Sequence, residues 1–243
     1  MTERTARAAT FDGLTCSAPE ARANRMAEIV LEQIPNGEAP LRVLDLGCGT
    51  GGLIFRLAAA LPQATCVGID ISPANIAAAE SARRLRADAA RLSFQTVDYL
   101  SWPTEPFDVI AIDGVLHLIP CDTAALVDKL AHDLRRGGVL VNAMPYACAY
   151  NTAFAVVRKA LRATRTSATD AAILRVGRWL HGEMSDDLLR ERVHYMYLPP
   201  QRVMNAALAA TMAARGLRIV ATRPMASTSL AQLKHNVTIL RKA

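Results

Sequence analysis

Four aspartates in the first half of the chain lie at the ends of short apolar segments, where carboxylates can bind a ligand. A carboxylate accepts hydrogen bonds from paired hydroxyl groups, such as those of a ribose, and attracts cationic groups. A single aspartate in such a place is more often a helix cap or a turn residue. Four in succession favour a ligand site. The candidates are Asp45, Asp70, Asp98 and Asp113.

A glycine-rich turn directly follows the first of these aspartates. Residues 45–51 read Asp-Leu-Gly-Cys-Gly-Thr-Gly. Glycine permits a tight turn and lets a ligand approach the backbone, and a helix that begins there presents its N–H groups to the ligand. Gly47, Gly49 and Gly52 also fit the pattern of dinucleotide-binding proteins, so the spacing alone leaves the ligand open. Asp45 argues against a pyrophosphate, which it would repel, and for a cationic amino-acid group.

Alternating strands and helices are predicted to position these residues. Short apolar runs predict strands, whereas N-cap residues, apolar helical faces and terminal glycine or proline predict helices. Such an alternation forms a parallel sheet with helices on both faces, and ligands bind at the carboxyl ends of its strands. The four aspartates would therefore gather at one edge. The predicted strands are 41–46, 65–69, 92–97, 107–112 and 139–143, and the predicted helices are 18–34, 53–61, 72–87 and 123–134.

The pattern changes after Pro145. Residues 147–193 are predicted to be helical only, which indicates an insertion after the fifth strand. A helix over 201–215 and strands over 217–222 and 236–241 would complete a doubly wound, mostly parallel sheet of seven strands. We therefore expect an α/β fold with an N-terminal helical cap (1–40), a cofactor-binding core (41–145), a helical substrate cap (146–200) and the C-terminal part of the core (201–243).

The turn at 45–51 resembles the first motif of class I S-adenosylmethionine-dependent methyltransferases of the small-molecule type. Segments 67–72, 94–99 and 107–117 resemble the next three motifs in order, so the resemblance covers residues 41–145. It implies a Rossmann-like fold, S-adenosylmethionine as the cofactor, and methyl transfer as the activity. It also implies that Asp70 binds the ribose hydroxyls and that Asp98 accepts from the adenine amino group. The residues that it places around the cofactor are Asp45, Gly47, Cys48, Gly49, Gly51, Asp70, Ile71, Asp98, Tyr99 and Asp113.

His117, just after the fourth predicted strand, is the candidate catalytic residue. Many small-molecule methyltransferases carry a similar histidine near the sulfonium and the substrate. It could pack against the cofactor loop, or it could act as a general base, because its ordinary pKa lies near neutrality. A carboxylate acceptor needs no base, whereas a phenol or a protonated amine does.

The arginine-rich insertion suggests a small anionic acceptor, such as a carboxylate or a phenolate, with O- or N-methylation as the reaction. Phe11 and Asp12 could form a flap over the cofactor, and Lys234 and His235 are interpreted as exposed residues at the start of the last strand. The candidate substrate-binding residues are Tyr146, Arg175, Arg178 and Tyr195.

The net charge of +6 leaves a nucleic-acid or protein methyltransferase as the alternative. Nucleic acid is disfavoured, because basic residues do not cluster with aromatic ones and residues 113–116 are not of the Asn-Pro-Pro-Tyr type. An NAD(P)-dependent oxidoreductase is a weaker alternative, because no Tyr-x-x-x-Lys pair is found. A non-catalytic cofactor-binding subunit is a third.

Further expectations concern location and assembly. No apolar stretch reaches the roughly 18 residues that span a bilayer, and the first residues lack the apolar run of a signal peptide. We therefore expect a cytoplasmic protein with no membrane contact. The five cysteines are widely spaced, which predicts reduced thiols and no metal site. A homodimer is left open.

Overall fold

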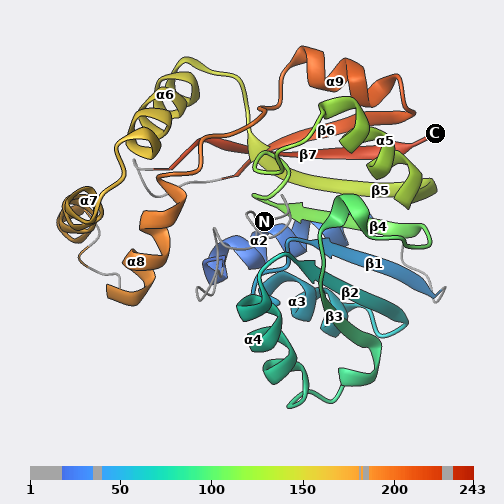
Figure 1. Cartoon of the computed structure of the whole chain (residues 1–243). Helices are drawn as coiled ribbons and strands as arrows, with labels where there is room; N and C mark the ends of the chain where they lie inside the picture. Colours follow the sequence, from blue (N-terminus) through green and yellow to red (C-terminus); the bar gives the residue numbers. More distant parts are fainter. Residues whose placement is uncertain (1–17, 35–39, 181, 183–185, 226–231) are drawn as a thin grey trace.

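The computed structural model describes residues 18–34, 40–180, 182, 186–225 and 232–243. Its centre is a seven-stranded sheet in the order β3-β2-β1-β4-β5-β7-β6 (Figure 1). Strands β1 to β5 are parallel, and β7 runs antiparallel to both of its neighbours. The strands are β1 (Leu41–Leu46), β2 (Ala64–Asp70), β3 (Leu92–Thr96), β4 (Phe107–Asp113), β5 (Leu134–Pro145), β6 (Leu217–Met225) and β7 (His235–Lys242).

Helices cover both faces of this sheet because the strands alternate their buried side chains between two cores. On β1, for example, Val43 belongs to one apolar cluster and Leu44 to the other. Burial on both faces explains why the strands read as continuous apolar runs. One cluster is covered by α2 (Glu20–Leu31), α3 (Gly52–Ala60) and α4 (Pro73–Arg83), the other by α5 (Thr123–Asp133) and α9 (Ala206–Ala213) (Figure 1).

The predicted fold class, a doubly wound and mostly parallel sheet of seven strands, is confirmed. Three predicted boundaries are wrong by four residues or more. The helix predicted over 72–87 ends at Arg83, and the helix predicted over 201–215 begins only at Ala206. Asn205 causes the later start, because its side chain accepts from the Leu208 N–H (2.8 Å) and caps the helix there. Strand β5 begins at Leu134, directly after α5, rather than after the glycine pair at 137–138.

The insertion after β5 forms three helices that stand beyond the carboxyl ends of the parallel strands (Figure 1). We call these helices the cap: α6 (Ala149–Ala163), α7 (Ser167–Leu180) and α8 (Asp186–Tyr195). The chain returns to the sheet where the Met204 N–H donates to the Pro145 carbonyl (2.8 Å). In the described part of the chain, no helix is long and apolar enough to cross a membrane.

The turn after β1 is held close to the loop after β4. The Gly47 and Cys48 N–H groups both donate to the Ile69 carbonyl, at 2.8 and 3.0 Å. Gly47 has a φ of 77°, and a Cβ added there would lie 2.2 Å from Cγ2 of Val115. The position therefore requires glycine both for its left-handed backbone and for the close approach of Val115.

We expect Gly47→Ala to destabilise the protein more than Gly137→Ala. Both substitutions put alanine into a left-handed backbone, which costs about 1–2 kcal/mol. A Cβ at Gly137, where φ is 75°, meets no described atom within 4 Å. Gly47→Ala adds overpacking against Val115, worth about 1–3 kcal/mol more. Chemical denaturation of the two variants measures the difference, and equal losses would contradict the close approach.

Candidate active site

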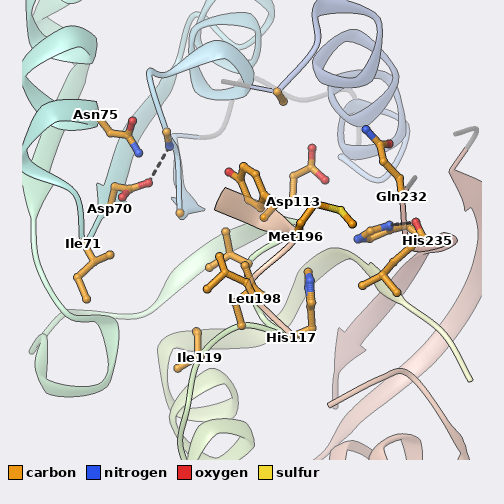
Figure 2. A pocket seen from close by; sticks show the side chains of 18 of the residues that line it. Asp70, Ile71, Asn75, Asp113, His117, Ile119, Met196, Leu198, Gln232 and His235 are labelled. Atoms are coloured by element: carbon orange, nitrogen blue, oxygen red, sulfur yellow. Dashed lines mark hydrogen bonds between the residues drawn. The ribbon is translucent and has the colours of Figure 1, made fainter. Parts of the chain in front are cut away.

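A cavity of about 770 Å³ lies between the carboxyl ends of the parallel strands and the cap. Two groups of side chains line it (Figure 2). Asp70, Ile71 and Asn75 lie at one end, which we call the cofactor end. His117 and His235 lie at the other end, which we call the acceptor end, and Asp113 lies between the two.

Asp45, at the end of β1, is almost completely buried at 2% exposure. Burial, and secondly the charges of Asp113 and Asp70, raise its pKa to about 8. Its Oδ2 atom is buried and has no hydrogen-bond partner among the described residues. A cation that the described residues do not supply would favour the ionised form of this buried group.

Asp70, at the end of β2, ties the glycine turn to the next helix. Its Oδ2 accepts from the Gly49 N–H (3.0 Å) and its Oδ1 from the Ser72 N–H (2.8 Å). Burial nevertheless raises its pKa, and these N–H groups offset part of the effect. Hydrogen bonds from the Asn75 side chain and the Ile71 N–H also lower its pKa, so the carboxylate is already surrounded by donors. Asp70 lines the cavity, and a hydroxyl group of a ligand there would share its oxygens with these donors.

The other predicted cofactor residues lie close by, with one exception. Asp98 Oδ1 accepts from the Leu100 N–H (3.1 Å) and so caps a short 3₁₀ helix, η2 (Tyr99–Ser101). Gly51 does not line the cavity but begins α3, with a φ of 91°. The cavity lining includes Asp45, Gly47, Cys48, Gly49, Asp70, Ile71, Asp98, Tyr99 and Asp113.

Asp113, at the end of β4, is paired with Arg22 of α2. The Arg22 Nε donates to both carboxylate oxygens at 2.9 Å, and its Nη2 lies 2.5 Å from Oδ1. Both side chains line the cavity. The sequence analysis did not identify Arg22, because nothing in the pattern of α2 shows which of its polar residues meets a strand tip.

His117 is buried, and its ring centroid lies 5.5 Å from that of His235. Burial, then the charges of His235 and Arg158, lower its pKa well below the ordinary value. Burial also lowers the pKa of His235 to about 4, and its Nδ1 lies 2.7 Å from the Leu233 carbonyl. Both rings are therefore neutral at pH 7. The interpretation of His235 as an exposed residue was wrong, whereas Lys234 is exposed as expected.

Arg202 holds the loop that carries His117. Its guanidinium donates to the carbonyls of Leu116 (2.7 Å), Ile119 (2.8 Å) and Cys121 (2.8 Å). The Gln201 N–H also donates to the His117 carbonyl (2.8 Å). Residues 201–205, which the sequence predicted as the start of a helix, are not helical, and Gln201 and Arg202 position the loop after β4.

The predicted substrate-binding residues are only partly brought together. Tyr195 lines the cavity, but Arg175 and Arg178 are exposed on α7 and do not line it. Tyr146 makes a bridge to Met204 and lines a separate hollow of about 610 Å³. The flap residues Phe11 and Asp12 lie outside the described residues. The cavity is instead lined by residues that the sequence analysis did not select, Arg22, Arg158, Arg162, Met196, Gln232 and His235.

The cofactor end fits the charge of S-adenosylmethionine. A buried carboxyl oxygen without a partner among the described residues lies at the β1 tip, and a second carboxyl group, at the β2 tip, lines the cavity. Among the described residues, no group of three or more histidine, cysteine, aspartate or glutamate side chains is arranged to hold a metal ion.

The comparison with protein families identifies this arrangement. The model of the methyltransferase domain family matches residues 38–187, more than half of the chain. The chain belongs to this family of methyltransferases. The resemblance to class I S-adenosylmethionine-dependent methyltransferases is thereby confirmed, and an NAD(P)-dependent oxidoreductase is no longer an alternative.

Individual relatives give a consistent picture. The methyltransferase is 36% identical over 173 residues to trans-aconitate 2-methyltransferase of Methylobacterium radiotolerans, covering 68% of this chain and 62% of that relative. The match to the homologous enzyme of Methylobacterium nodulans is 38% over 122 residues, covering 50% of this chain and 44% of the relative. The chain thus aligns with less than two thirds of the length of these curated relatives.

Among solved structures, magnesium protoporphyrin IX methyltransferase from Synechocystis, with bound SAH, superposes with a TM-score of 0.59 at 17% identity. The superposition covers 92% of this methyltransferase and 83% of that chain. The cyclase SpnF superposes with a TM-score of 0.60, also at 17% identity, over 90% of this chain and 80% of its own. These likenesses show the fold.

We expect the methyltransferase to bind S-adenosylmethionine more tightly as the pH rises toward about 8, the pKa of Asp45. A cation favours the ionised form of this carboxyl, so binding releases a proton below that pH. Asp45→Asn should abolish the release and weaken binding roughly 10- to 100-fold. Titration calorimetry in buffers with different ionisation enthalpies measures both quantities.

The matched control is Asp128→Asn, which removes an exposed carboxylate that pairs with Arg215. The folded-state pKa of Asp45 lies above its ordinary value. The folded protein therefore loses stability as the pH rises between about 4 and 8 and this group ionises. Asp45→Asn should therefore raise the Tm of the ligand-free protein at pH 8. Proton release that persists in Asp45→Asn would contradict the role of this carboxyl.

Proposed function

We propose that this chain transfers the methyl group of S-adenosylmethionine to a carboxylate oxygen of a small organic acid. The observation that carries the proposal is the charge of the acceptor end. Arg158 and Arg162 line the cavity beside two histidines that are neutral at pH 7. Cationic groups of this kind recognise an anionic acceptor.

A carboxylate acceptor also agrees with the absence of a suitable base at His117. Its pKa is lowered because a charge there would be buried beside arginines. A carboxylate is already a nucleophile at neutral pH, so no proton needs to be removed. His117 is then a neutral hydrogen-bonding group that orients the acceptor, and Arg202 positions it through the loop carbonyls.

S-adenosylmethionine, when bound, supplies a methyl group that its sulfonium activates. The chain contributes orientation and exclusion of water. Asp45 and Asp70 would hold the cofactor at the tips of β1 and β2, with the acceptor placed beyond Asp113. Apolar residues that line the cavity, including Leu189 and Val193 of the cap and Leu198 just after it, would keep water from the reacting carboxylate.

The size of the cavity supports a small acceptor over a nucleic acid or a protein. About 770 Å³ lies within the range of small-molecule sites, roughly 300–1,000 Å³, and must hold the cofactor as well. The curated relatives are named trans-aconitate 2-methyltransferases, and that acceptor is a small polycarboxylic acid. Macromolecular methylation remains the alternative that the experiment below must exclude.

The test is incubation of the purified chain with S-adenosylmethionine and trans-aconitate, succinate, a phenol and a primary amine. We expect a mass gain of one methylene unit on an organic acid. Mild base should remove the methyl group as methanol, because a methyl ester is hydrolysed and an N-methyl group is not. A base-stable product, or label only on protein or nucleic acid, would refute the proposal.

Assembly and location remain proposals too. We propose a cytoplasmic protein that forms a homodimer through the cap, where Val156, Val176 and Trp179 are exposed at 62%, 54% and 83%. Large apolar side chains exposed to this extent often mark an interface. Light scattering coupled to size exclusion should give a dimer for the wild type and a monomer for Trp179→Glu. A monomeric wild type would refute the dimer.

A further inference from the structure

Arg158 of α6 is a buried cation whose hydrogen bonds are incomplete. It is 6% exposed, and its Nη1 donates to the Leu198 carbonyl (3.2 Å). Its Nε is buried and has no partner among the described residues. The Phe154 ring lies 5.1 Å from the guanidinium carbon and covers one side of the group.

No carboxylate of the described residues forms an ion pair with Arg158. Burial lowers its pKa to about 10, so the guanidinium is still charged at neutral pH. A buried charge without a partner is strongly unfavourable, and chains retain such groups chiefly where a ligand supplies the opposite charge. An anion that enters the cavity would supply the opposite charge that no carboxylate of the described residues provides.

The direction of α6 places this charge at the acceptor end. Arg158 lies close enough to His117 and His235 to lower the pKa of each. Arg162 follows one helical turn later and lines the same cavity, as residues four apart share a helix face. Lys159, between them in sequence, is exposed and lines the separate hollow instead.

The free edge of the guanidinium has the geometry of a carboxylate clamp. Arg22 uses its Nε and Nη2 to bind the Asp113 carboxylate. Nη1 of Arg158 donates to the Leu198 carbonyl. The edge formed by Nε and Nη2 is then the one that can bind a carboxylate. A carboxylate held by two such donors has one lone pair of each oxygen engaged and its charge partly neutralised, so it is a weaker nucleophile than a free carboxylate. In an acceptor with two carboxylates, the one held by Arg158 would therefore be the less reactive.

We propose that Arg158, assisted by Arg162, binds a second carboxylate of the acceptor, so that the acceptor is at least a dicarboxylic acid. This inference rests on the proposed function. It adds that one carboxylate is clamped on α6 while another, on the same molecule, points toward the cofactor end and accepts the methyl group. Arg158 is then a specificity-determining residue, and a monocarboxylic acid lacks the group that it recognises.

The experiment compares two acids of the same length and geometry, fumarate with two carboxylates and crotonate with one. We expect the wild type to prefer fumarate in kcat/KM by roughly 30-fold or more, the range for a desolvated charge pair. Arg158→Gln should raise KM for fumarate by a similar factor and leave crotonate unchanged. Arg158→Lys should restore part of the preference, because it keeps the charge without the fork.

Lys159→Gln is the matched control, with the same loss of charge one residue away, and should leave the preference unchanged. If Arg158→Gln fails to fold, Arg162→Gln tests the same subsite, because Arg162 is exposed. This variant is expected to reduce the preference for fumarate over crotonate several-fold. Equal effects on both acids, or a wild type without preference, would overturn the subsite.

Calorimetry with fumarate alone separates the two proposals. Fumarate that binds the wild type but not Arg158→Gln supports the subsite, even where no methyl ester forms and the proposed function fails. Methyl esters formed equally well from both acids support the function and overturn the subsite. Fumarate binding that is unchanged in both Arg158→Gln and Arg162→Gln also overturns it.

Discussion

The active site depends on the repulsion among carboxylates that the parallel sheet brings together. The tips of β1, β2 and β4 place Asp45, Asp70 and Asp113 near one another, and the charges of the other two help to raise the pKa of Asp45. Arg22 neutralises Asp113 from α2. The carboxyl groups at the tips of β1 and β2 have no cationic counterpart in the described chain, and their raised pKa values mean that a cationic ligand favours their ionised forms, which makes that end selective for such a ligand.

Positive charge predominates at the acceptor end of the same cavity, and the separation of the two charges orients the two ligands. Arg158 and Arg162 project from the cap, while the tips of the strands carry the acids. A cationic methyl donor and an anionic acceptor would each be attracted to a different end and repelled from the other. Neutral histidines between them avoid a charge that would favour either ligand at the wrong end. Orientation would thus come from charge as well as shape.

The sequence predicted the cofactor end far better than the acceptor end, for a physical reason. Each parallel strand ends at the same edge, so residues such as Asp45 and Asp70 can be placed from local patterns alone. Cap residues face the cavity according to how helices pack, and both Arg158 and Arg175 lie on arginine-rich helices. Only packing shows that the first is buried and the second exposed. His235 was missed likewise, because β7 reaches the site from the other end of the chain.

The buried polar groups without partners give an independent reason to assign chemistry to this cavity. Among the described residues, such atoms occur in six side chains, and Asp45, His117 and Arg158 line the cavity. The Tyr99 hydroxyl lies near Asp133 of α5, and Asn142 and Thr238 face each other across β5 and β7. Unsatisfied groups reduce stability, so their concentration in one place indicates a site completed by ligands. The fold alone would not indicate this, since the cyclase SpnF shares it at a TM-score of 0.60. The reaction is therefore determined by the side chains that the cap and the strand tips leave unpaired.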